Sequence, residues 1–256
     1  FVNGIAAMSA SGKYGDTEIC AGIVGFADLT MGASVEEVLH LQILAGGSRF
    51  KGIRYGAGYD PSPDINNSHT NPPPGIYNDR KFREGFAKLK QFDLSFEAWL
   101  YHPQIDDVIS LARAFPTQPI VLNHFGGPIG IGPYKNNRDQ VFIEWKQSIQ
   151  ALSKCPNVFA KLGGLGMVIN GYQLEVNSTP PSSVELAKLW SRYFETTIEA
   201  FGTDRCMFES NFPVDKVTST YAVYWNCFKR IAQNASADEK QELFHDTAKK
   251  FYRLEV

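Results

Sequence analysis

Short apolar runs alternate with longer segments of helical period along the whole chain, and this alternation most constrains the fold. Between the apolar runs, apolar residues recur every three to four positions, as in the stripe Ile105, Val108, Ile109 and Ala112. Strict strand–helix alternation predicts an α/β fold, with a parallel sheet covered by helices. Six runs are predicted to be buried strands: 21–29, 50–57, 95–101, 119–125, 158–162 and 206–212.

Three serines mark predicted helix starts. The segments Ser34–Glu37, Ser182–Glu185 and Ser236–Glu239 have the form of a capping box, in which the two side chains bind free backbone N–H groups. Residues 58–78 have no periodicity and contain Pro72–Pro74. A stretch of this kind inside a compact domain predicts a long loop at the mouth of the fold.

Two architectures share this alternation: a doubly wound Rossmann sheet and a (β/α)₈ TIM-type barrel. A dinucleotide-binding Rossmann fold needs Gly-x-Gly-x-x-Gly between a strand and a helix. The nearest segment, Gly126–Gly132, contains Pro128 and leads into a polar loop, which disfavours that fold. A barrel has eight strand–helix units, and six are visible. The sequence therefore predicts an incomplete TIM-type barrel.

Charge and hydropathy exclude other classes of protein. The formal net charge of −2 provides no basic field for nucleic acid, and no apolar run is long enough to cross a bilayer. Cys20, Cys155, Cys206 and Cys227 form no Cys-x-x-Cys pair, which argues against a zinc–thiolate site. With no visible targeting segment, a cytoplasmic protein without nucleic-acid or membrane partners is expected.

Polar residues at strand ends are the candidates for chemistry, because active sites of parallel α/β folds gather at the carboxyl ends of strands. Arg54 and Lys161 each interrupt an apolar strand, where a charge is either buried in an ion pair or faces a cavity. His102, His124 and Asp28 each end a strand.

Other polar residues are assigned by position alone. On the last strand, Glu209 and Asn211 share one face. We expect His40, His69 and His245 on the solvated surface, since they fall on helices or in the polar loop.

Five segments together carry a family resemblance. They fall in order along essentially the whole chain: Gly22–Leu29, Gly52–Tyr55, Val121–Gly126, Ala160–Gly164 and Met207–Val214. This series resembles the amidohydrolase-2 family of TIM-barrel hydrolases, and most of all its sugar-lactonase and dicarboxylate-lactonase branch. The resemblance implies a (β/α)₈ barrel that hydrolyses a small carboxylated or sugar-derived lactone. The alternatives are a metal-dependent decarboxylase of the same family and a catalytically incomplete barrel.

The chain departs from the family pattern at its start. In the family the first strand carries a His-x-His pair, and this pattern is missing from the sequence. Residues 1–15 resemble the helix that follows the family's second strand. The six units are therefore expected to be the third to eighth of one barrel domain, 1–256, truncated at its amino end. Truncation leaves unpaired edge strands, so a homo-oligomer is expected.

The second departure concerns the metal set. The family's last strand ends in Gly-Ser-Asp-Trp-Pro, and Asn211 stands where that Asp would bind metal or activate water. A carboxamide is a poor metal ligand, which leaves His124 as a weak metal candidate, and one His does not hold zinc. Divalent metal such as zinc is therefore predicted to be absent or weakly bound here, while full-length relatives can use it.

The resemblance and the strand-end placement together assign roles. His124 or His102 is the expected general base, and Asn211 is expected to orient water or the carbonyl. Arg54 is expected to clamp a substrate carboxylate. The substrate, a small carboxylate or lactone, is expected to contact Arg54, Lys161, Tyr55 and Asp28.

Overall fold

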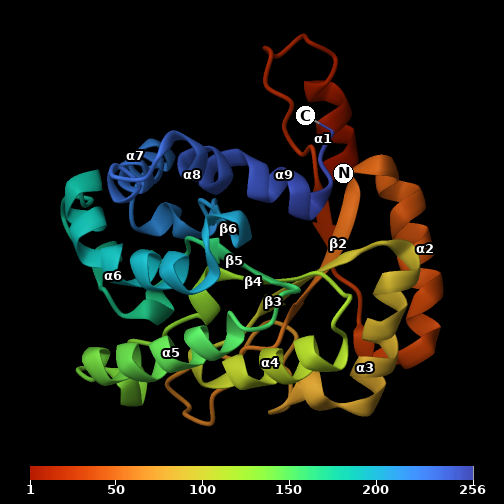
Figure 1. The fold of residues 1–256 in the computed structure, drawn as a ribbon, viewed down its shortest axis with the longest axis horizontal. Helices are drawn as coiled ribbons and strands as arrows, with labels where there is room; N and C mark the ends of the chain where they lie inside the picture. Colours follow the sequence, from red (N-terminus) through yellow and green to blue (C-terminus); the bar gives the residue numbers. More distant parts are fainter. Residues whose placement is uncertain (256) are drawn as a thin grey trace.

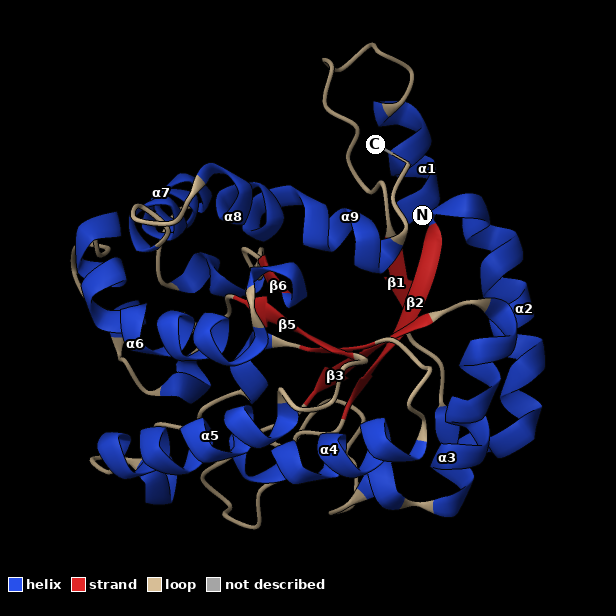
Figure 2. Cartoon of the chain, in the orientation of Figure 1, coloured by secondary structure: helices blue, strands red, loops and turns tan. Residues whose placement is uncertain are grey.

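The computed structural model describes residues 1–255, and its centre is one parallel sheet of six strands in the order β1-β2-β3-β4-β5-β6. The strands are β1 Ile23–Gly25, β2 Phe50–Gly56, β3 Ser95–Trp99, β4 Ile120–Leu122, β5 Val158–Leu162 and β6 Cys206–Phe208. Each strand pairs with the next strand along the chain, and the sheet curls into a half-barrel (Figure 2). The predicted α/β alternation is confirmed.

Helices occupy the crossovers and both ends of the chain (Figure 1). They are α1 Val2–Ser9, α2 Val35–Gly46, α3 Arg80–Phe86, α4 Ile105–Ala114, α5 Arg138–Leu152, α6 Ser183–Phe201, α7 Tyr221–Ile231, α8 Ala237–Gln241 and α9 Thr247–Tyr252. A π-helical turn, Glu242–Asp246, joins α8 to α9. Helix α1 and the segment after it project from the body of the molecule in Figure 1.

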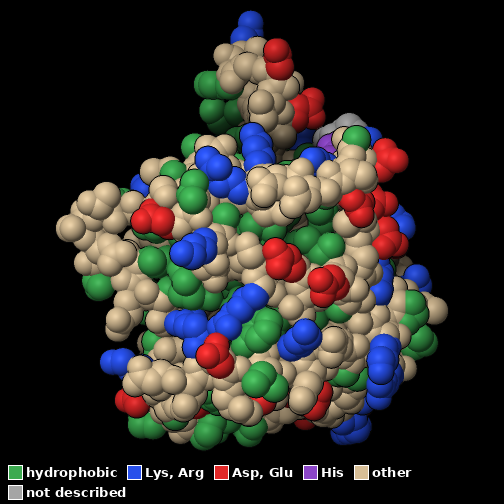
Figure 3. Space-filling view, turned by 60° about the vertical axis from the view of Figure 1, so that its left-hand side comes forward, with side chains coloured by type: hydrophobic (Ala, Val, Ile, Leu, Met, Phe, Trp, Pro, Cys, Tyr) green, Lys and Arg blue, Asp and Glu red, His purple; other side chains and the backbone are tan. Residues whose placement is uncertain are grey.

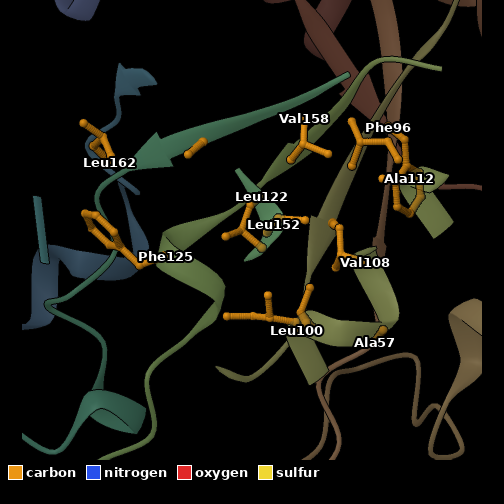
Figure 4. Close-up of a cluster of buried hydrophobic side chains, with 14 of the residues drawn as sticks. Ala57, Phe96, Leu100, Val108, Ala112, Leu122, Phe125, Leu152, Val158 and Leu162 are labelled. Atoms are coloured by element: carbon orange, nitrogen blue, oxygen red, sulfur yellow. The ribbon is translucent and has the colours of Figure 1, made fainter. Parts of the chain in front are cut away.

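The two faces of the sheet carry different residues because side chains alternate along a strand. Leu122 and Val158 belong to the main core, together with Val108 of α4 and Leu152 of α5 (Figure 4). The strand residues that alternate with Leu122 and Val158 point to the concave inner face. The inner face holds a separate apolar cluster of Val121, Met207 and Phe251, with Phe159 packed against it.

Helix α9 covers part of this inner face. Its residue Phe251 is buried against Phe159 of β5, with ring centroids 4.9 Å apart. In Figure 2, α8 and α9 run from α7 toward β1 and β2, along the open side of the curled sheet. The end of the chain therefore helps to enclose the interior of the half-barrel.

Capping boxes form at Ser182 and Ser236, as predicted, and start α6 and α8. The box predicted at Ser34 does not form, although Ser34 does precede α2. Ser34 has helical backbone angles because a 3₁₀ turn, Leu29–Ser34, runs directly into α2. Its hydroxyl therefore turns back and donates to the carbonyl of Met31 at 2.8 Å.

Five of the six strands are shorter than predicted, most of all β1, β4 and β6. The run 21–29 forms a strand only over Ile23–Gly25, because Asp28 already caps the following turn by accepting from the N–H of Thr30 at 3.0 Å. The run 206–212 forms a strand only over Cys206–Phe208, and Asn211 already has a positive φ of 51°.

The outer surface mixes charges of both signs. On the face drawn in Figure 3, basic and acidic side chains are interspersed rather than gathered by sign. Among residues 1–255, every helix is too short or too polar to cross a membrane.

Candidate functional site

A carboxylate at the centre of the inner face, Glu97 of β3, gathers the charged groups. Its Oε2 accepts from Nε of Arg54 on β2 at 2.7 Å and from Nδ2 of Asn123 after β4 at 3.2 Å. Its Oε1 accepts from Nζ of Lys161 on β5 at 2.7 Å and from the hydroxyl of Tyr252 in α9. Three other strands or strand ends and the last helix therefore place donors on one side chain, which is 2% exposed.

The two cations keep Glu97 ionised. Burial opposes the charged carboxylate, but the positive charges of Lys161 and Arg54 outweigh it and hold the pKa of Glu97 well below its usual range. Each cation also retains N–H groups that Glu97 does not use. The Arg54 side chain is 39% exposed and the Lys161 side chain 12%. These spare donors are available to a bound molecule.

The second part of the site is the pair formed by His124 and Glu209. Glu209 follows β6, and its Oε1 bonds Nδ1 of His124 and accepts from the His124 backbone N–H at 3.3 Å. Burial opposes ionisation of Glu209, but its interactions with His124 and Lys161 outweigh this effect and lower its pKa. Nζ of Lys161 lies 3.8 Å from Oε2 of Glu209, so this pair is continuous with the Glu97 group.

Local backbone geometry allows the close approach of His124 and Glu209. The chain turns sharply after β4, and His124 has a φ of +52°. A Cβ at Gly164 would lie 2.7 Å from Cβ of His124, and a Cβ at Gly163 would lie 2.1 Å from the carbonyl oxygen of Glu209. The Gly163-Gly164 pair after β5 therefore leaves room for both residues.

A cavity of about 530 Å³ opens beside the Glu97 group. Its wall includes Arg54, Glu97, Lys161 and Tyr252, and its rim includes Phe26 and His69. The charges of Arg54, Lys161 and Glu97 sum to +1. The cavity thus offers an excess of positive charge and spare donors, which suits a small anionic or hydroxylated molecule.

Asn211 forms a hydrogen bond with the buried carboxyl group of Asp215. Its Nδ2 donates to Oδ1 of Asp215 at 2.7 Å, and Oδ2 of Asp215 accepts from the N–H of Gly166 at 3.2 Å. Asp215 is fully buried, and burial raises its pKa to about 7 against the effect of these hydrogen bonds. Asp215 therefore fixes the carboxamide of Asn211 at the end of β6.

Five residues assigned from the sequence lie outside the cavity wall: His124 and Asn211, whose contacts are given above, and His102, Tyr55 and Asp28. His102 is buried, its Nδ1 accepts from the N–H of Ile129 at 3.3 Å, and burial lowers its pKa to about 4. Tyr55 packs edge-on against Phe82 in the core, because alternation along β2 turns it away from Arg54. Asp28 caps a turn. The assignments of His102 as a base and of Tyr55 and Asp28 as substrate contacts stay predictions.

The structure also adds residues that the sequence analysis did not assign. Glu97 interrupts an apolar strand just as Arg54 and Lys161 do, and that signal was available. Tyr252 reaches the site through packing of the last helix, for which the sequence holds no local signal. His69 was expected on the solvated surface; it is exposed, but it lies at the rim of the cavity.

In the part of the chain that the structure describes, the site does not bring together enough side chains to hold a metal ion. Within residues 1–255, no three His, Cys, Asp or Glu side chains lie together in a way that could hold a metal ion. Both oxygens of Glu97 are already engaged, and Nδ1 of His124 is bound to Glu209. The described residues do not by themselves fit a metal ion.

Two curated proteins are similar to this chain over most of its length. The uncharacterized protein y4mH of Sinorhizobium fredii is 36% identical over 91% of this chain and 70% of its own length. An L-fucono-1,5-lactonase of Burkholderia multivorans is 23% identical over 91% of this chain and 72% of its own length.

A solved structure shares the fold. The crystal structure of an amidohydrolase from Burkholderia multivorans with bound zinc matches with a TM-score of 0.73 at 23% identity, over 91% of this chain and 74% of that one. The sequence profile of the Amidohydro_2 family, described as amidohydrolase, matches residues 17–254. With this match over nearly its whole length, the chain belongs to the Amidohydro_2 family of amidohydrolases.

Proposed function

We propose that this protein hydrolyses a small lactone that carries a carboxylate or several hydroxyl groups. One observation carries the proposal: Arg54 and Lys161 share the carboxylate of Glu97 and both line the same cavity. A buried carboxylate that holds two partly free cations in place forms a preorganised site for carboxylate and carbonyl oxygens. The lactonase named among the relatives supports the same reaction class.

Substrate binding is assigned to Arg54. The guanidinium has five N–H donors in a fork, and the Nε and Nη2 atoms contact Oε2 of Glu97. The N–H groups that remain can bind a carboxylate or a pair of hydroxyls in the cavity. Glu97 prevents the fork from rotating, so its orientation does not have to be fixed again on binding.

Water activation is assigned to His124. Because ionised Glu209 binds Nδ1, that nitrogen carries the proton, and Nε2 keeps the lone pair that can accept one. In the proposed step, water attacks the lactone carbonyl carbon while its proton moves to Nε2 of His124. The ring C–O bond then breaks, the proton passes to the leaving oxygen, and a hydroxy acid is released.

Negative charge that develops on the carbonyl oxygen needs a hydrogen-bond donor, and Lys161 is assigned to this role. Its Nζ lines the cavity and lies 3.8 Å from Oε2 of Glu209, so it connects the binding wall to the His124 pair. An ammonium next to a developing oxyanion stabilises the transition state more than the neutral carbonyl. Asn211, fixed by Asp215, is assigned to orient the water or the carbonyl.

A matched pair of lactones tests the function. D-Glucaro-1,4-lactone carries a carboxylate where D-glucono-1,4-lactone carries a hydroxymethyl group, and L-fucono-1,5-lactone adds a second ring size. Ring opening is followed by proton release in weak buffer. The wild-type protein is expected to hydrolyse at least one of them, and His124→Ala is expected to lose at least about 100-fold in kcat.

The carboxylated and the neutral 1,4-lactone together also test the role of Arg54. Arg54→Ala is expected to raise KM more for the carboxylated lactone than for the neutral one, by about 10- to 100-fold. Arg113→Ala removes an exposed arginine of α4 and is the control, expected to behave as wild type. Absence of hydrolysis by the wild-type protein with all three lactones would reject the proposal and favour a catalytically incomplete barrel.

A further inference from the structure

The long loop 58–78 is tied to the end of β2 on both sides of one residue, His69. The N–H of Ser68 donates to the carbonyl of Gly58 at 2.8 Å, and the N–H of Gly58 donates to Oγ of Ser68 at 3.0 Å. On the other side, the hydroxyl of Thr70 donates to the carbonyl of Gly56. The backbone that carries His69 is therefore fixed by hydrogen bonds of both its neighbours.

The sequence around His69 supports this close approach. A Cβ at Gly58 would lie 2.8 Å from Oγ of Ser68, and a Cβ at Gly56 would lie 3.1 Å from its Cβ, so both glycines leave room for the loop. Pro72–Pro74 follow shortly after, and each proline restricts its own φ. A loop of this length would otherwise be free to move, and here it presents one side chain in a defined place.

The imidazole of His69 is available to a ligand. It lies at the rim of the cavity that Arg54, Glu97 and Lys161 line. Its ring packs edge-on against Phe26, with centroids 6.1 Å apart. Within residues 1–255 the ring makes no hydrogen bond or ion pair, so both nitrogens are unused. His40 of α2 is also exposed but is not part of the cavity wall.

We propose that His69 is a substrate-contacting residue, which hydrogen bonds a hydroxyl or carbonyl oxygen of the lactone while Arg54 binds its anionic end. The proposal rests on the proposed lactone hydrolysis and assigns the second contact of the same cavity. A neutral imidazole has one donor and one acceptor, which matches a hydroxyl group. A fixed loop with an unpartnered polar ring at a cavity rim gives this contact at little cost in ordering.

The substrate class follows from the two contacts. Arg54 and Lys161 outweigh Glu97 by one positive charge, so a ligand with one carboxylate neutralises the wall. His69 adds a contact for a polar uncharged group away from that carboxylate. Together they favour a hydroxylated lactone with one free carboxylate over a lactone of hydrocarbon character.

His69→Ala, His69→Gln and the control His40→Ala test this contact in steady-state kinetics with D-glucaro-1,4-lactone and D-glucono-1,4-lactone. His69→Ala is expected to raise KM about tenfold for both lactones, with a smaller change in kcat, because one hydrogen bond is lost from each complex. His69→Gln keeps a donor and an acceptor and is expected to recover part of that loss. His40→Ala is expected to match wild type.

The outcomes separate this inference from the function on which it rests. If the wild-type protein hydrolyses a lactone and His69→Ala keeps KM within about twofold, the contact is wrong and the function stands. If the wild-type protein hydrolyses none of the three lactones, both fall; if it hydrolyses only L-fucono-1,5-lactone, the same variants are measured with that lactone and the same expectations apply. Thermal unfolding is measured alongside: because the His69 side chain is exposed, an unchanged midpoint supports the contact, and a large drop in both His69 variants would show a structural role instead.

Discussion

Lys161 and Glu97 form a buried ion pair across the inner face of the half-barrel, with Nζ and Oε1 2.7 Å apart and side chains 12% and 2% exposed. The same carboxylate also binds Arg54 through its other oxygen. Glu97 therefore balances two cations, and without it they would repel each other next to the cavity. This relationship makes Glu97 the residue on which the geometry of the proposed site depends.

Glu97→Gln is expected to destabilise the protein by about 3 kcal/mol, because it deprives a buried ammonium of its close counter-charge and leaves only Glu209, 3.8 Å away. Urea unfolding gives the free energy, and the double variant Glu97→Gln/Lys161→Met is expected to recover part of it, since the unpaired charge is then gone. Asp139→Asn breaks the surface pair of Asp139 with Arg192, whose side chains are 90% and 36% exposed. This control variant is expected to lose less than about 1 kcal/mol in the free energy of unfolding. Equal losses in Asp139→Asn and Glu97→Gln would contradict the central role of Glu97.

Gly164→Ala is expected to lower kcat of lactone hydrolysis at least about tenfold, because the new methyl group would lie 2.8 Å from Nδ1 of His124 and displace the ring from Glu209. Gly75→Ala is the matched control. Gly75 also has a positive φ, 70° against 84° for Gly164, but a Cβ there meets nothing within 4 Å. Both variants are expected to lose stability through backbone strain, and only Gly164→Ala is expected to lose activity beyond that. Equal activities would show that the space beside His124 is unimportant.

Asp215 makes stability depend on pH with a definite sign. Its pKa is about 7 in the folded protein, raised by burial, and about 3.9 in an unfolded chain. Between these values the folded protein holds a proton that the unfolded chain has lost, so stability falls as pH rises. The contribution is complete below about pH 4 and is lost as pH passes through about 7.

Asp215→Asn is expected to flatten this dependence by on the order of 2 kcal/mol between pH 5 and pH 8, measured by urea unfolding at several pH values. Burial lowers the pKa of His102 to about 4, so this residue lowers stability as the pH falls. Its contribution is the same in the wild-type protein and in Asp215→Asn. The difference between wild type and variant therefore isolates Asp215. Parallel curves would show that Asp215 does not titrate in this range.

Much of the fold was predictable, because strand–helix alternation is a local pattern. The strand 158–162 was predicted at its exact bounds, and the helix start at Ser182 follows from its own capping chemistry. Strand ends were less predictable. A residue such as Asp28 at the end of an apolar run can cap a turn, and the strand then ends before the run does. Where a strand ends also depends on its pairing with the neighbouring strand.

The site was predictable only where alternation along a strand decides it. Arg54 and Lys161 point inward because every second residue does, and the same rule turns Tyr55 outward. Their counter-charge, Glu97, was equally visible as a charge within an apolar run. The approach of His69 and Tyr252 depends on packing of a loop and of the last helix, which no local periodicity encodes.

Tyr252 provides the last test, because it links the end of the chain to the proposed site. Its hydroxyl donates to Oε1 of Glu97, and burial together with the charge of Glu97 raises its pKa well above the usual range. Tyr252→Phe removes this hydrogen bond and keeps the ring packed against Phe251, whose centroid is 4.8 Å away. We expect a loss of about 1 kcal/mol in urea unfolding.

The matched control for that variant is Tyr221→Phe. Tyr221 is 52% exposed and packs edge-on against Phe212, while its hydroxyl makes no hydrogen bond within residues 1–255. Its change is expected to stay below about 0.5 kcal/mol, as for surface substitutions in general. Since Lys161, Arg54 and Asn123 still bind Glu97 in Tyr252→Phe, activity should fall less than in Glu97→Gln. A Tyr252 variant as stable as the Tyr221 variant would mean that the last helix encloses the site by packing alone, without support from its hydroxyl.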